Sequence, residues 1–163
     1  MLLNDAYLGK RLQDLLTVTE GQMKSVYAAH GLVIPVEGSS TLHILAPGTW
    51  MSLTEIARDL GQSHQLIAQR IDKLLKLKLV TKRDDPEDGR RSEYGLTPAG
   101  QEQWQRLDQL MLATTKVNQQ LFEEIGCHLI QALDTAREAL IRQDYQTRFG
   151  TITSTIEHEE ART

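Results

Sequence analysis

The sequence predicts a mainly α protein with a small β-hairpin wing, an α+β winged-helix fold with long helices at both ends. Three observations predict this fold. Between residues 52 and 78, two short amphipathic segments are separated by only two residues, the spacing of a helix-turn-helix. Two extended segments joined by turn-forming residues follow, as in a β-hairpin. Apolar residues three and four positions apart continue on both sides, which is typical of long amphipathic helices.

Composition places the chain among folded proteins that lie outside membranes. Hydrophobic residues make up 40% and charged residues 25%, which is usual for a globular protein. No apolar run approaches the ~20 residues needed to cross a bilayer, and the N-terminus lacks the pattern of a secretory signal. We therefore expect a cytoplasmic location and no membrane partner. The single cysteine, Cys127, excludes an intrachain disulfide.

The first long helix is predicted over residues 3–29. Its apolar side recurs in steps of three and four despite two internal glycines, and His30-Gly31 ends it. The apolar positions are Leu8, Leu12, Leu15, Leu16, Thr19, Met23, Val26 and Tyr27. A loop or helix start is expected at residues 35–40, followed by a short helix over residues 40–46.

Two helix caps mark the helix-turn-helix. Ser52 and Glu55 have the spacing of a capping box, in which each side chain bonds the other residue's backbone N–H. Gly61 supplies the left-handed residue that ends the first helix, and Ser63 is the expected N-cap of the second, which runs to residue 78. The predicted inward residues are Leu53, Ile56, Ala57, Leu60, Leu66, Ile67, Ile71, Leu74 and Leu75.

The opposite face of the second helix is polar. Gln and Arg side chains hydrogen-bond the edges of DNA bases, whereas Lys mainly contacts phosphates. A solvated helix face has a similar composition, so this stripe alone leaves both interpretations open. Its members are Gln65, Gln69, Arg70, Lys73 and Lys76.

A hairpin follows the second helix. Strands are predicted over residues 79–83 and 91–96, and residues 84–89 between them are rich in turn-forming Asp, Pro and Gly. The complete winged helix-turn-helix domain is expected to span residues 40–100.

The C-terminal part is predicted to be helical. Thr97-Pro98 is a strong helix start, and the helix from residue 98 to 125 ends at a break near Gly126. A final helix covers residues 128–149, and residues 151–163 are expected to be a frayed acidic tail. The apolar side of the first of these helices contains Trp104, Leu107, Leu110, Met111, Val117, Leu121 and Ile125.

Positive charge is concentrated in the winged segment. Residues 52–91 contain nine Lys or Arg and seven Asp or Glu, a net charge of +2, although the whole chain carries −4. The rest of the chain carries nine basic and fifteen acidic residues, a net charge of −6. This distribution favours a protein that contacts double-stranded DNA with one face only.

Residues 1–39 and 101–150 are predicted to form a helical dimerisation region. Their apolar stripes are too long for the small winged domain to bury, whereas the same helices of a second copy would bury them in a two-fold homodimer. Such a dimer would present two recognition helices to major grooves ~34 Å apart on a pseudo-palindromic operator. A monomeric helical bundle is the alternative.

Several motifs resemble the MarR family of bacterial transcription regulators. The wing tip is Asp88-Gly89-Arg90, and the second strand ends in Leu-Thr-Pro-Ala-Gly at residues 96–100. Upstream lie Ser-x-x-Glu-Ile-Ala-x-x-Leu-Gly from Ser52 and Leu-x-x-Leu-x-Leu-Val from Leu74. The resemblance covers nearly the whole chain. It implies a homodimer that binds promoter DNA, usually as a repressor, and that a small-molecule effector or an oxidant often releases.

The resemblance also implies roles for individual residues. Arg90 corresponds to a wing-tip arginine that enters the minor groove, and Asp88 would orient it by a charge-assisted hydrogen bond. Lys82 and Arg91 complete the candidate wing contacts. His64 either contacts DNA or is simply an exposed first-turn residue. The recognition-helix positions are Ser63, His64, Gln65, Gln69, Arg70 and Lys73.

Some residues are similar to a MarR subgroup that is often joined to a GNAT acetyltransferase domain. They are Ser63-His64, Gly89-Arg90-Arg91, and Tyr27 with Gly31. Because the chain ends near where such a domain would begin and has no acetyl-coenzyme-A loop, we expect no acetyltransferase activity. It also lacks a nucleophile elbow, a phosphate-cradling loop and paired catalytic carboxylates, so we predict neither an enzyme nor a cofactor.

Two other groups of residues have two interpretations each. Tyr27, His30, His43 and Trp50 either line an effector pocket or fill a helix junction. Cys127 is an oxidant sensor or an inert thiol, and its surroundings lack the ligand spacing of a metal site. The sequence therefore predicts a transcription regulator. A winged-helix module that binds proteins, without specific DNA binding, is the alternative function.

Overall fold

The computed structural model describes residues 5–86 and 89–160, and it divides into two compact units. The first extends to Ala113 and the second begins at Thr114, so the boundary lies within the long helix α5 (Pro98–Glu124). Each unit is described by itself. In the described ranges, no helix is both long and apolar enough to cross a membrane.

The first unit begins with the predicted long helix. A short 3-10 turn, η1 (Asp5–Tyr7), leads into α1 (Leu8–Ala29), and Gly31 follows the helix with a φ of +66°. A second 3-10 turn, η2 (Val36–Gly38), then leads into α2 (Ser39–Ile44). The predictions for this region are confirmed to within a few residues at each end.

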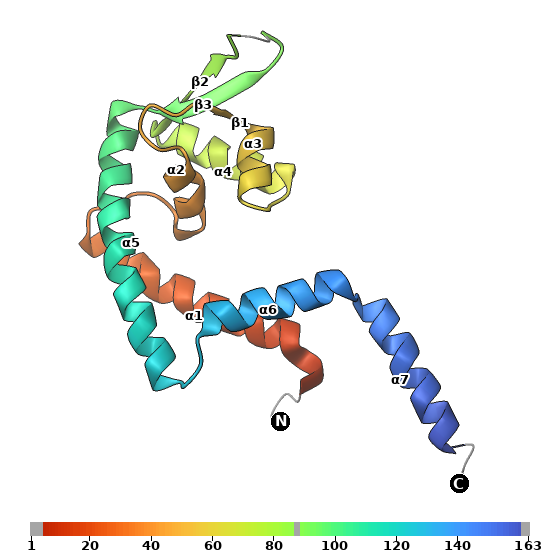
Figure 1. Cartoon of the computed structure of the whole chain (residues 1–163). Coiled ribbons are helices and arrows are strands. Elements are labelled where there is room, and N and C mark those ends of the chain that lie inside the picture. The colour runs from red at the N-terminus through yellow and green to blue at the C-terminus, as the bar shows by residue number, and fades with distance from the viewer. Residues whose placement is uncertain (1–4, 87–88, 161–163) are drawn as a thin grey trace. The chain divides into compact units, whose positions relative to one another are not determined.

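The helix-turn-helix consists of α3 (Leu53–Asp59) and α4 (His64–Lys76), which lie close together in Figure 1. The capping box is confirmed, because the Glu55 N–H donates to Ser52 Oγ at 3.3 Å and the Ser52 N–H donates to Glu55 Oε2 at 2.8 Å. Gly61 has a φ of +60°, and Ser63 Oγ accepts from the Leu66 N–H. Both cap predictions are therefore confirmed.

The wing is a three-stranded antiparallel sheet in the order β1-β3-β2. Strands β2 (Val80–Asp84) and β3 (Ser92–Leu96) form the predicted hairpin, which projects beyond the helices in Figure 1. Strand β1 (Met51–Ser52) pairs with β3 and was not predicted, because two residues are too few to show a strand pattern. This strand joins the hairpin directly to the N-terminus of α3.

The core of the first unit lies where α2, α3, α4 and α5 meet. Ile67, Ile71 and Leu74 of α4 are at most 1% exposed, as expected for residues spaced four and three apart on one helix side. Leu66 was predicted to face inward, but it is 38% exposed. The prediction was wrong because Leu66 lies about 100° around the helix from Ile67, outside the buried stripe.

The start of α5 is fixed to the end of α4. Thr97 Oγ1 accepts from the Gly100 N–H at 3.0 Å and donates to the Lys78 carbonyl at 2.7 Å, so the predicted N-cap also joins two helices. A Cβ atom on Gly100 would lie 1.9 Å from the Leu79 carbonyl oxygen. Glycine is therefore required here for close backbone approach.

The second unit contains the end of α5 and two further helices, α6 (Leu129–Arg142) and α7 (Tyr145–Glu160). Gly126, with a φ of +63°, ends α5 as predicted. The single helix predicted over residues 128–149 is wrong, because Gln143 is extended and Asp144 Oδ1 accepts from the Thr147 N–H to begin a new helix. α7 continues to Glu160 within the predicted tail, residues 161–163 lie outside the described residues, and the fraying of the tail stays a prediction.

Candidate nucleic-acid interface

The buried stripe of α4 determines which side chains the helix presents to solvent. With Ile67, Ile71 and Leu74 in the core, the positions opposite them on the helix are exposed. They are Gln65, Gln69, Asp72 and Lys76. This face therefore offers amide groups for base edges and one cation, but also one carboxylate that the sequence prediction did not include.

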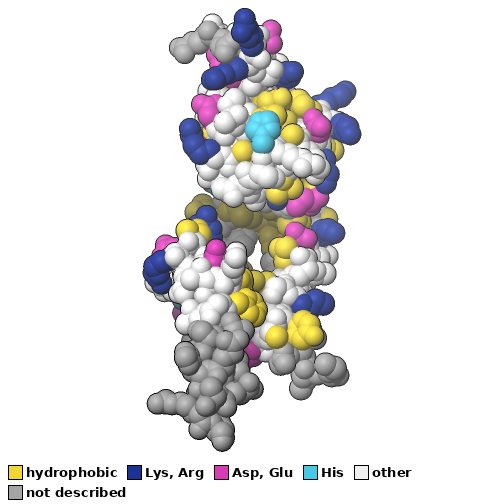
Figure 2. Space-filling model, turned by 90° about the vertical axis from the view of Figure 1, so that its right-hand side faces the viewer, with side chains coloured by type: hydrophobic (Ala, Val, Ile, Leu, Met, Phe, Trp, Pro, Cys, Tyr) yellow, Lys and Arg dark blue, Asp and Glu magenta, His cyan; other side chains and the backbone are white. Residues whose placement is uncertain are grey.

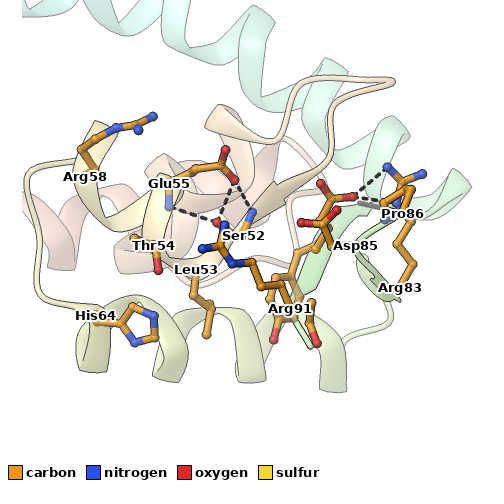
Figure 3. Close-up of a pocket in the computed structure, with 13 residues that line it drawn as sticks. Ser52, Leu53, Thr54, Glu55, Arg58, His64, Arg83, Asp85, Pro86 and Arg91 are labelled. Atoms are coloured by element: carbon orange, nitrogen blue, oxygen red, sulfur yellow. Dashed lines mark hydrogen bonds and ion pairs between the residues drawn. The ribbon is translucent and has the colours of Figure 1, made fainter. Parts of the chain in front are cut away.

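Three other predicted positions lie at or beside the first turn of this helix. Ser63 uses its hydroxyl as the N-cap, where it accepts from the Leu66 N–H. His64 is exposed and lines the groove that Figure 3 shows between this turn and the wing. Gln65 is exposed on the same turn. The structure thus brings these three positions together at the N-terminus of α4.

Arg70 and Lys73 are engaged within the chain. Arg70 is half-buried and donates to Gln62 Oε1 in the helix-turn-helix turn. It adjoins Ile71 in sequence and lies on the flank of the buried stripe, away from the centre of the polar face. Lys73 Nζ lies 3.0 Å from Glu37 Oε1. Periodicity alone did not reveal either partner, because Gln62 and Glu37 lie outside the helix.

The carboxylate of Glu37 is held in its charged form. A hydrogen bond from its own backbone, together with the one from Lys73, lowers the pKa of Glu37 below its usual value. Because 54% of the Lys73 side chain and 38% of the Glu37 side chain are exposed, the pair contributes only about 0–1 kcal/mol. Lys73 can therefore exchange this partner for a phosphate at small cost.

The wing presents three of its four predicted residues to solvent. Lys82, Arg90 and Arg91 are exposed, and the Asp85 N–H donates to the Arg91 carbonyl at 3.0 Å, just beyond the last strand pair. Asp88 lies outside the described residues. The orientation of Arg90 by Asp88 therefore stays a prediction.

A groove of about 900 Å³ lies between the helix-turn-helix and the wing. In Figure 3, Arg58 and His64 lie at the helical end of this groove and Arg83 and Arg91 on its wing side. Acidic groups also line it, but Glu55 is held by its capping box. Hydrogen bonds from the backbone and side chain of Ser52 lower the pKa of Glu55. The groove thus combines several cationic side chains with carboxylates that have partners within the chain.

One cluster in the wing was missed by sequence reasoning. The Arg83 guanidinium lies 4.0 Å from the centroid of the Trp50 ring, and its Nη2 lies 2.7 Å from Glu93 Oε2. Arg83 and Glu93 are direct cross-strand partners in the hairpin. Their opposite charges could have indicated the pair once the hairpin register was known, but Trp50 becomes a neighbour only through the unpredicted strand β1.

The four residues suggested for an effector pocket lie in four different surroundings. Tyr27 is buried in the core, and His30 is exposed, with Nδ1 2.8 Å from the Val26 carbonyl. His43 stacks on Trp104 and lies 3.2 Å from Asp108. Trp50 packs beneath Arg83. An effector pocket formed by these side chains stays a prediction.

The segment from α2 to the first strand of the hairpin matches a known family model. Residues 41–91 match the model of the MarR family. This match shows that the helix-turn-helix segment is similar to that of the MarR family, over less than a third of the chain. No protein among the curated sequences matches this chain.

Solved structures of transcription regulators share the fold of this chain over most of its length. The PcaV transcriptional regulator from Streptomyces coelicolor is 18% identical with a TM-score of 0.61, covering 88% of this chain and 99% of its own. The adhesin competence repressor AdcR from Streptococcus pyogenes is 17% identical, with a TM-score of 0.58 and coverage of 83% and 96%. A probable transcriptional regulator from Pseudomonas aeruginosa is 21% identical, with a TM-score of 0.53 and coverage of 80% and 95%.

Proposed function

We propose that this protein is a transcription regulator that binds specific sequences in double-stranded DNA. One observation carries the proposal: the start of α3 and the first turn of α4 lie on one side of a groove, and the Arg-bearing wing lies on the other, in a domain similar to that of the MarR family. An α-helix fits the major groove, and a wing beside it can reach the neighbouring minor groove. A DNA backbone would then pass along the groove between them.

The exposed side chains fall into two groups, one suited to recognising DNA bases and one suited to binding the phosphate backbone. Gln65 and Gln69 carry the amide groups that bond adenine edges, while His64 and Lys82 are suited to phosphates. Arg90 would enter a narrow minor groove. Arg70 is assigned a supporting role in the turn, because its guanidinium already bonds Gln62.

We further propose that the protein acts as a homodimer. Large apolar side chains remain exposed on α1, α5 and α6, and Figure 2 shows hydrophobic side chains at the surface of helices outside the winged domain. A second copy would bury them and would place two α4 helices on successive major grooves of a pseudo-palindromic operator. The side chains are Leu8, Leu12, Leu15, Leu16, Val117, Leu121, Ile130, Leu133 and Ile141.

Repression and release by a small molecule complete the proposal. AdcR, which shares the fold, is named a repressor, and the PcaV structure contains that protein's natural ligand. Both observations concern those proteins, and they support the same arrangement here. An effector is expected to weaken DNA binding by favouring a dimer in which the two α4 helices no longer match the groove spacing.

A gel-shift experiment with the DNA that flanks the protein's own gene tests the proposed function. We expect sharp binding that weakens steeply with salt. Arg90→Ala should weaken binding most at A·T-rich wing positions, and Gln69→Ala should relax base preference. Equal losses on all sequences for Gln69→Ala would exclude base recognition by this residue. Absence of binding at low salt would favour the protein-interaction alternative, and a purely monomeric sedimentation profile would exclude the dimer.

A further inference from the structure

Beyond the Lys82–Tyr94 pair, the described residues of the hairpin include no buried side chain that could hold it against the helices. Along β2, only Val80 is buried, and the next four residues are exposed. Arg90 lies three residues before Glu93, so it is at most about 10 Å from the Arg83–Glu93 pair at ~3.3 Å per residue. A tilt of about 10° at that pair would displace the Arg90 backbone by up to about 2 Å, about half of the ~3.4 Å spacing of successive bases. Positioning Arg90 in a groove therefore needs a fixed hairpin angle.

Trp50 lies between the helix-turn-helix and the hairpin, where its side chain can fix the hairpin angle. It directly precedes β1, whose Ser52 is the N-cap of α3, so its backbone belongs to the helix-turn-helix side of the domain. A Cβ atom built on Gly95 would lie 2.9 to 3.0 Å from three atoms at the centre of the Trp50 indole. Similar distances to three ring atoms mean that the face of the indole covers the backbone of β3 at Gly95.

Arg83 reaches this indole from the other strand of the hairpin. Its guanidinium carbon lies 4.0 Å from the ring centroid, within the range of a cation–π contact. Its Nε and Nη2 lie 2.9 and 2.7 Å from Glu93 Oε2, which holds the guanidinium plane in one orientation. Trp50, Arg83, Glu93 and Gly95 thus connect all three strands of the sheet.

We propose that Trp50 and Arg83 are positioning residues that hold the wing at a fixed angle to the helix-turn-helix, and that Arg83 is not a DNA contact. The proposal rests on the proposed function, because it assigns the wing angle to DNA binding. The charge of Arg83 is balanced by Glu93, a side chain that is only 17% exposed. Arg83 therefore contributes little attraction to phosphate, although it lines the groove (Figure 3).

Salt dependence distinguishes positioning from contact. We expect Arg83→Met and Arg83→Lys each to weaken binding about tenfold, since lysine lacks the planar fork that stacks on Trp50 and bonds Glu93. Neither variant should change the slope of log affinity against log salt. Lys82→Met, the neighbouring exposed cation, is the matched control and should reduce that slope by about 0.9, the value for one phosphate contact.

Two results would overturn the proposal. If Arg83→Lys bound like the wild type and Arg83→Met lost about 0.9 of the slope, Arg83 would be a direct phosphate contact.

The second result concerns hydrogen exchange of the protein without DNA. Arg83→Met and Trp50→Leu should speed exchange of the β2 and β3 amides while α4 amides stay protected, and unchanged exchange would rule out the constraint. If the wild type binds no duplex, the proposed function fails, while exchange still tests the constraint.

Discussion

Helices α4 and α6 have nearly the same length, 13 and 14 residues, and both have one apolar side, yet they differ completely in burial. α4 buries Ile67, Ile71 and Leu74 within the first unit. α6 lies entirely in the described part of the chain and buries no residue, and its Leu133 is 41% exposed. An amphipathic pattern thus predicts a helix and its apolar side, but burial depends on a second element that covers it.

This difference in burial agrees with the two proposed roles, DNA binding by the winged domain and homodimerisation by the flanking helices. The winged unit has its own core and can hold α4 and the wing in place within one chain. The helices with open apolar sides would gain their stability from a second copy of the chain. Substitutions matched between the two units can therefore test whether the difference is real, and the four below run from the largest expected effect to the smallest.

The largest effect is expected at helical glycines. Gly100→Ala should destabilise the first unit by on the order of 4 kcal/mol, because its Cβ would collide with the Leu79 carbonyl. Gly150→Ala in α7, where an added Cβ atom would meet nothing within 4 Å beyond its own helix turn, should instead stabilise its helix by up to about 1 kcal/mol. Urea denaturation measures both changes. A loss below about 1 kcal/mol for Gly100→Ala would show that the helix contact is not tight.

Truncated leucines test burial directly. Leu74→Ala, at a fully buried position, should cost about 3 kcal/mol at every protein concentration. Leu133→Ala should change little in a monomer but should raise the dissociation constant of a homodimer, because its exposed side chain would lie in the interface. Thermal unfolding over a range of concentrations, with sedimentation, separates the two. A Leu133→Ala protein that dimerises like the wild type would remove Leu133 from the interface.

The helix caps should show a smaller, pH-dependent difference. Ser52→Ala should cost about 1 kcal/mol at pH 7. Hydrogen bonds from Ser52 lower the pKa of Glu55, and those from Thr147 lower the pKa of Asp144. Each carboxylate therefore stabilises its helix above its unfolded pKa, and this contribution is lost as pH falls through the lower folded pKa.

Glu55→Gln keeps an acceptor for the Ser52 N–H but has no carboxylate to protonate. The first unit of this variant should therefore lose less stability than the wild type as pH falls. Asp144→Asn should have the same effect on the helicity of α7. Circular dichroism between pH 7 and pH 3 measures both losses. A loss identical to that of the wild type in both variants would contradict the assignment of these carboxylates as caps.

The smallest effect is expected at two left-handed residues. Lys78 ends α4 with a φ of +57°, and Gly126 ends α5 with a φ of +63°. Lys78→Gly should therefore stabilise the protein by roughly 0.5–1 kcal/mol, and Gly126→Ala should destabilise it by a similar amount. The denaturant midpoints of the two variants show whether each substitution raises or lowers the stability. Destabilisation by Lys78→Gly would mean that the lysine side chain contributes more than its backbone strain costs.

The local structure of the winged domain was largely predictable. Ser52 with Glu55, Gly61, Ser63 and Thr97 each use bonds or torsions confined to a few neighbouring residues, so their spacing was sufficient. The split between α6 and α7 was missed because Asp144 begins a helix inside a continuous polar and apolar pattern. The helix α4 was predicted, but the sequence did not show that its Arg70 and Lys73 have partners in the turn and in η2.

The sequence by itself determined the caps, the buried side of α4, the strands of the hairpin and the MarR-type motifs around them, because all of these depend on short-range spacing. The tertiary structure alone decided which side chains meet across distant elements. It placed Trp50 against Gly95 and Arg83, and Lys73 beside Glu37. It also left the apolar side of α6 open. Such contacts depend on how separate elements pack, which residue spacing within a single segment does not specify.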